Sequence, residues 1–69
     1  MTAKQIVYAG LGYAGMSARD LAAKLGWSPA SLNNRLGTGK FSVEEWEQIA
    51  KCMGAELKLG FKFKDGREI

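Results

Sequence analysis

Hydrophobic residues in the first 54 positions recur every three or four residues, whereas after Gly54 they recur every second residue. Spacing of three and four is typical of helices that bury one face, and alternation is typical of a strand. Four helical segments are expected before Gly54, each preceded by a hydroxyl residue that can cap a helix N-terminus. The four capping residues are Thr2, Ser17, Ser28 and Ser42.

Start and stop signals divide these segments. Gln5, Asp20 and Glu45 stand three residues after three of the caps, as in a capping box, and Pro29 follows Ser28 at a first helical position. Gly26, Gly37 and Gly54 are expected to end the second, third and fourth helices. The residues expected to face the core are Ala3, Ile6, Val7, Gly10, Leu11, Ala14, Leu21, Ala22, Leu25, Leu32, Leu36, Val43, Trp46, Ile49, Ala50 and Met53.

The segment after Gly54 predicts a β extension over residues 55–69. Its hydrophobic residues alternate with Lys58, Gly60 and Lys62, and Asp65-Gly66 is a good turn dipeptide. Only three residues remain after the turn to pair back, so much of the strand's edge is unmatched and can accept another chain. We therefore expect the strand to pair with that of a second subunit through Leu57, Leu59, Phe61 and Phe63.

Composition excludes several classes of function. The chain has 69 residues, no histidine and a single cysteine, Cys52, so we expect no metal site, disulfide or cofactor. No acid/base pair stands out, so we do not expect an enzyme. An unpaired thiol is typical of proteins in the reducing environment of the cytoplasm, where we expect this chain. No apolar run resembles a signal peptide or a membrane helix.

Positive charge gathers in the first part of the chain. Residues 1–40 carry five basic residues and one acidic residue, whereas residues 41–69 carry five basic and six acidic ones. Such an excess indicates a polyanionic partner for the first forty residues.

The stretch AGLGYAG, residues 9–15, has the spacing G-x-G-x-x-G that holds a dinucleotide pyrophosphate in some proteins. That motif needs a strand before it and an acidic residue about 20 positions later. Here a helix is expected before the glycines, and Arg35 stands near the acidic position. We interpret the glycines as the end of the first helix, with Gly10 allowing the second and third helices to approach.

Residues 21–32 carry the most informative pattern. A helix-turn-helix needs a small residue in its first helix, a residue tolerant of positive φ in the turn and a hydrophobic residue in its second helix. Ala22, Gly26 and Leu32 meet these needs. Residues 17–54, with the helix before them, resemble the Cro/phage-repressor (Xre-like) helix-turn-helix family. The matching residues are Leu21, Ala22, Leu25, Gly26, Trp27, Ser28, Leu32, Gly39 and Lys40.

The resemblance implies a four-helix DNA-binding domain over residues 1–54, followed by the C-terminal β-strand or hairpin, in a repressor-like transcriptional regulator of phage or prophage type. Helix 28–36 would enter the major groove of double-stranded DNA. A homodimer would read two half-sites about 34 Å apart. Expected base contacts are Ala30, Ser31, Asn33, Asn34 and Arg35. Expected phosphate contacts are Ser17, Arg19, Ser28, Thr38 and Lys40.

Two departures from the family pattern stand out. Arg35 occupies a position that is often aliphatic, and the usual fifth helix is replaced by the β extension. The exposed strand edge also supports an alternative, a protein-interaction or antitoxin-like module in which residues 55–63 bind a different protein. Trp27 and Trp46 are expected to pack in the core rather than stack on bases. The sequence does not indicate which operator is bound or whether the regulator represses or activates.

Overall fold

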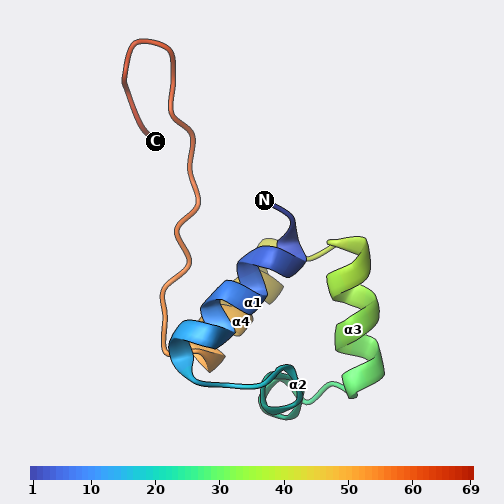
Figure 1. The fold of residues 1–69 in the computed structure, drawn as a ribbon. Coiled ribbons are helices and arrows are strands. Elements are labelled where there is room, and N and C mark those ends of the chain that lie inside the picture. Colours follow the sequence, from blue (N-terminus) through green and yellow to red (C-terminus); the bar gives the residue numbers. More distant parts are fainter.

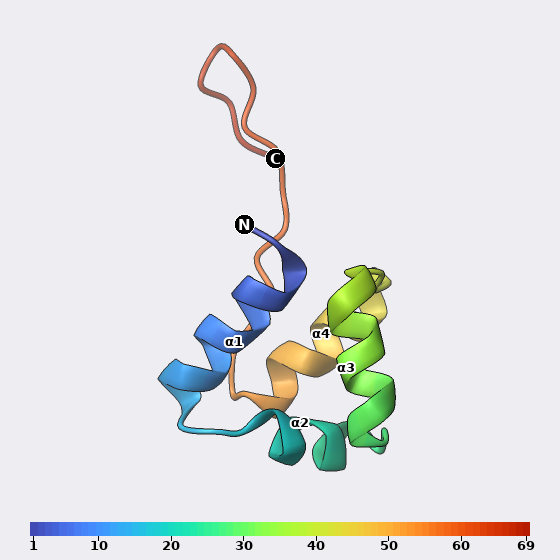
Figure 2. The same cartoon turned by 45° about the vertical axis from the view of Figure 1, so that its right-hand side comes forward.

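The computed structural model describes residues 1–69 and contains four helices, so the prediction of a mainly α domain is confirmed. They are α1 (Ala3–Ala14), α2 (Ala18–Leu25), α3 (Pro29–Thr38) and α4 (Val43–Cys52). In Figures 1 and 2, α1 and α3 stand on opposite sides of the helical part, with α2 across one end; α4 lies behind α1 in Figure 1 and is seen between α1 and α3 in Figure 2. None of the four is both long enough and apolar enough to cross a membrane.

The expected N-terminal caps are confirmed. The hydroxyl oxygen of each capping residue accepts a hydrogen bond from the backbone N–H three positions later, at 3.0–3.2 Å. At α1, α2 and α4 the side chain of that third residue accepts the N–H of the cap in return, which completes a capping box. The four caps are Thr2, Ser17, Ser28 and Ser42.

The C-terminal boundary predicted for the third helix is wrong by two residues. Gly37 lies within α3, and the helix continues to Thr38. Gly39 then adopts the left-handed conformation (φ 70°) and its N–H donates to the Arg35 carbonyl at 2.8 Å. A left-handed cap favours glycine, and the segment offers two glycines two residues apart, so the sequence pattern alone did not separate them.

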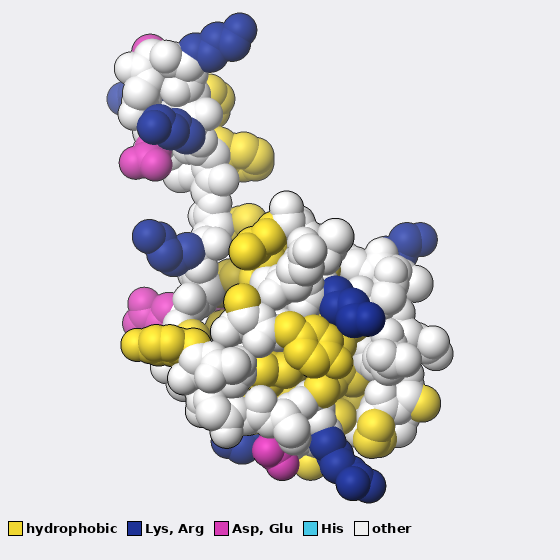
Figure 3. Space-filling view, in the orientation of Figure 1, with side chains coloured by type: hydrophobic (Ala, Val, Ile, Leu, Met, Phe, Trp, Pro, Cys, Tyr) yellow, Lys and Arg dark blue, Asp and Glu magenta, His cyan; other side chains and the backbone are white.

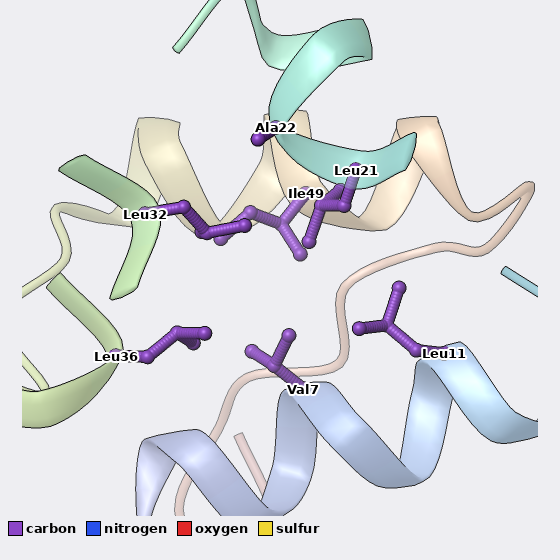
Figure 4. Close-up of a cluster of buried hydrophobic side chains, with 7 residues drawn as sticks. All are labelled: Val7, Leu11, Leu21, Ala22, Leu32, Leu36 and Ile49. Atoms are coloured by element: carbon purple, nitrogen blue, oxygen red, sulfur yellow. The ribbon is translucent and has the colours of Figure 1, made fainter. Parts of the chain in front are cut away.

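Each helix contributes two buried residues to one small core. Figure 4 shows the side chains of α1, α2, α3 and α4 converging on a common centre. Seven of them form a continuous cluster with at most 3% exposure. The cluster comprises Val7, Leu11, Leu21, Ala22, Leu32, Leu36 and Ile49.

Some residues predicted to face the core lie at its edge. Ile6 and Val43 are 47% and 50% exposed. Gly10 was expected to accommodate the second and third helices, but its Cα faces α4 instead. A Cβ built at Gly10 would lie 3.0 Å from Sδ of Met53. The glycine therefore allows α1 to approach the C-terminal end of α4.

Residues 55–69 form an extended arm (Figures 1 and 2): residues 55–58 lie beside α1 and α4, with Leu57 half-buried, and the rest rises away from the helices. The arm folds back on itself through an isolated antiparallel bridge between Lys62 and Glu68, and the structure contains no β-strand. Because of the arm, the radius of gyration is 13.2 Å, against about 11 Å for a compact chain of this length. The predicted strand is thus represented only by this hairpin.

Candidate nucleic-acid interface

A three-residue connection, residues 26–28, joins α2 to α3 and fixes their relative direction. Gly26 is left-handed (φ 75°), as the sequence predicted. Its N–H and that of Trp27 donate to the carbonyls of Ala23 and Ala22, at 3.2 and 2.9 Å. These paired bonds close the end of α2 and turn the chain into α3. Ala22 is fully buried, which lets the two helices pack closely.

The outward face of α3 carries small and amide side chains. Leu32 and Leu36 are buried, and at 100° per residue this orientation directs Ala30 and Asn34 into solvent, with Asn33 at one edge. All three are exposed. No acidic residue occurs from Leu21 to Val43, so no carboxylate of this segment would repel a polyanion on this face.

The N-termini of α2 and α3 differ in charge. At α2, the Asp20 carboxylate accepts the N–H of Ser17 at 3.2 Å, and this bond with the Ser17 backbone holds the pKa of Asp20 below its usual value. A negative charge therefore already occupies that helix end. At α3, Ser28 accepts the N–H of Ser31 and donates its hydroxyl to the Ser31 hydroxyl at 2.9 Å, with no acid in the first turn. Of the two serines predicted to contact phosphate, Ser28 thus lies at the helix N-terminus with the more favourable electrostatic potential for an anion.

Arg35, predicted as a base contact, is held by groups of the protein itself. Its guanidinium donates to the Glu45 carboxylate, and its Nε donates to the Lys40 carbonyl at 3.0 Å. The guanidinium carbon lies 5.2 Å from the Trp27 ring centroid and 5.4 Å from that of Phe41. The side chain is therefore fixed on the flank of α3 that faces α4, and 37% of it is exposed.

Glu45 joins this cluster to the start of α4. Its Oε1 accepts the N–H of Ser42 at 2.9 Å as well as the guanidinium of Arg35. The Ser42 N–H, and after it Arg35, hold the pKa of Glu45 below its usual value. Sequence reasoning missed this pair because its members lie ten residues apart on two different helices, and no local motif brings them together.

Two half-buried aromatic residues, Trp27 and Phe41, flank Arg35, and a third, Trp46, packs on Phe41; all three pack against the core. The rings of Trp27 and Phe41 are almost parallel, with centroids 6.4 Å apart, and Trp46 lies 5.0 Å from Phe41 at a tilt of 54°. The expectation that both tryptophans contribute to packing is confirmed.

The remaining predicted phosphate contacts lie around the C-terminal end of α3 and on α2. The Thr38 hydroxyl donates to the Arg35 carbonyl at 3.2 Å and accepts the Lys40 N–H at 3.4 Å, so Thr38 organises the loop. Lys40 and Arg19 are exposed and belong to no salt bridge. Both cations are available to an external anion.

A shallow hollow of about 450 Å³ lies along one flank of α3. It runs from the turn to the Arg35 side chain, and its lining is mostly polar. The lining residues are Gly26, Trp27, Ser28, Ser31, Asn34 and Arg35.

Comparison of the chain with protein-family models, curated proteins and solved structures gives no match. The function of the chain is therefore inferred from the geometry of α3 and its surroundings.

Proposed function

We propose that this chain is a helix-turn-helix regulator that binds double-stranded DNA, with α3 as the helix that enters the major groove. The observation that carries the proposal is the exposed face of α3. It presents Ala30, Asn33 and Asn34 to solvent on a helix without a carboxylate. An asparagine side chain can form two hydrogen bonds with adenine, and an alanine side chain can contact the thymine methyl group.

The surroundings of α3 support the same function. Lys40 follows the C-terminal cap of the helix, and Ser28 exposes an uncompensated N-terminus at its other end. Phosphate groups of DNA pass on both sides of a helix in the major groove, so a cation at one end of α3 and free N–H groups at the other favour this docking.

Arg35 takes a different role in this proposal from the one that the sequence suggested. Reading a guanine would require the side chain to leave Glu45 and the Lys40 carbonyl. We therefore assign base recognition to the asparagines and to Ala30 and Ser31. Arg35 positions the Lys40 loop against α3.

The arm supports assembly of a homodimer. Phe61 and Ile69 exchange both of their backbone hydrogen bonds, so the N–H and C=O groups of Gly60 and Lys62 point to the opposite, unpaired edge. Leu59 and Phe61 are 73% and 74% exposed. A lone hairpin is marginally stable in water, whereas two paired arms would give a sheet of four strands.

Selection of binding sites from random duplex DNA at near-physiological salt tests the function. We expect enrichment of one motif with two related half-sites. Asn34→Ala and Asn33→Ala should each weaken binding to that site by about 1–3 kcal/mol. Gln48→Ala, a matched loss of an exposed amide on α4, should leave affinity unchanged. Absence of any enriched motif would contradict the proposal.

Sedimentation equilibrium of full-length variants tests the dimer. Leu59→Ser combined with Phe61→Ser should shift the chain to monomer, whereas Tyr13→Ser, at a residue 94% exposed on α1, should not. A dimer that survives the arm substitutions would contradict pairing through the arm.

The exposed arm also favours a second candidate, a module that binds a different protein through residues 55–63. A monomeric chain that binds no duplex and co-purifies with a partner at high salt would support this alternative. The loss of that partner in the arm variant would locate its binding site.

A further inference from the structure

A second cleft, of about 320 Å³, lies on the flank of α3 opposite the turn hollow. It is enclosed by α1, α2 and α3. Its floor includes Leu32 and Leu36 of the core, and its rim carries Tyr8 from α1, Arg19 from α2 and Asn33 from α3. Asn33 borders the outward face of α3, so the cleft opens beside the helix that we propose to read DNA.

The polar groups at this rim are suited to an anion. The Arg19 guanidinium and the Tyr8 hydroxyl are donors, no carboxylate lines the cleft, and Tyr8 is 45% exposed. Lys4 precedes Tyr8 by one helical turn and therefore adds charge on the same side of α1. In Figure 3, hydrophobic atoms occupy the centre of the face between α1 and α3, with basic side chains at its upper and lower ends.

Asp20, the acidic residue next to Arg19 in the sequence, does not line the cleft. Asp20 directs its carboxylate to the backbone N–H of Ser17 at the start of α2. Arg19 itself forms no salt bridge.

We propose that this cleft holds a phosphate of the DNA backbone, with the Tyr8 hydroxyl and the Arg19 guanidinium as donors and Lys4 nearby as additional charge. The inference depends on the proposed DNA binding and extends it to α1. With α3 in the major groove, one strand passes on the Lys40 side and the other passes over this cleft. Tyr8 and Lys4 are contacts that the sequence pattern did not indicate, because no motif marks them.

The competing role for Tyr8 is to cover the floor of the cleft with its ring. Tyr8→Phe keeps the ring and removes only the hydroxyl, so it separates the two roles. Arg19→Gln removes the charge and keeps a side chain of similar length. Tyr13→Phe is the matched control, because Tyr13 is exposed on α1 and does not line the cleft.

The experiment is fluorescence anisotropy of the full chain with a labelled duplex that carries the selected site, and with a duplex in which that site is scrambled. Tyr8→Phe should weaken binding to both duplexes by the same factor, roughly three- to tenfold, the range of one net hydrogen bond. Arg19→Gln should reduce the slope of log affinity against log salt by about one. Tyr13→Phe should bind as the unmodified chain does.

Three results separate failure of this inference from failure of the proposed function. Unchanged affinity and salt slope in both cleft variants, alongside weaker binding by Asn34→Ala, would overturn the phosphate site and leave DNA binding intact. A Tyr8→Phe effect confined to the selected duplex would also overturn it, since a phosphate contact is insensitive to sequence. Binding of no duplex by the unmodified chain would overturn the proposed function itself.

Discussion

Replacing Gly26 by alanine tests the turn that orients α3. Gly26 has φ 75° and ψ 22°, and a Cβ built there meets no atom within 4 Å. The effect is therefore backbone strain without a steric clash. Left-handed backbone costs alanine about 1–2 kcal/mol, and the lower entropy of the unfolded chain offsets roughly 0.5 kcal/mol of this. We expect a net destabilisation of about 1 kcal/mol, which lowers the midpoint of thermal unfolding by about 4–8 °C in a domain of this size.

Gly12→Ala is the matched control for this prediction. Gly12 lies inside α1, and a Cβ there also meets nothing within 4 Å, but its φ is negative. Alanine should therefore stabilise the helix by roughly 0.5–1 kcal/mol. Both variants can be followed by circular dichroism at 222 nm during thermal and urea unfolding. An increase in stability for Gly26→Ala would refute the left-handed turn, and a decrease for Gly12→Ala would refute the extent of α1.

Three further predictions concern the core, the ion pair and the arm. Leu32→Ala, at a residue 1% exposed, should destabilise the fold by about 2–5 kcal/mol in urea unfolding. The pKa of Glu45 is lowered from its usual 4.5, so the ionised carboxylate stabilises the fold at higher pH, and this stabilisation is lost when the group is protonated. Glu45→Gln should therefore make the free energy of unfolding fall less steeply between about pH 5 and pH 3. Gly60→Ala would bring a Cβ within 2.4 Å of the Ile69 carbonyl oxygen; the amides of Phe61 and Ile69 should lose hydrogen-exchange protection while the helices keep theirs.

The helices were predictable because local signals and the hydrophobic period agree. Ser17 and Ser28 mark the starts of α2 and α3 through bonds that span three residues, and Gly26 ends α2 by a conformation that few other residues adopt. Leu32 and Leu36 then follow from the helical period. Such features depend on neighbours in the sequence, and so the sequence was sufficient for them.

The surroundings of Arg35 and the arm could not be predicted in the same way. Arg35 lies on an exposed flank by helical period alone, and its contacts with Glu45 and Phe41 exist only after α4 has packed against α3. The alternation of Leu59 and Phe61 predicts a strand. A strand also needs a partner, and the arm pairs back on itself only through the hydrogen bonds of Phe61 with Ile69 and of Phe63 with Arg67.

An NMR titration of the ¹⁵N-labelled full chain with the selected duplex tests directly whether α3 binds DNA. We expect the largest chemical-shift changes at α3, including the side-chain amides of Asn33 and Asn34, with smaller changes at Tyr8, Arg19 and Lys40. The NMR signal of the Gln48 side-chain amide on α4 should not shift. Shifts confined to residues 55–69, or no shifts at all, would contradict the claim that α3 is the surface that reads DNA.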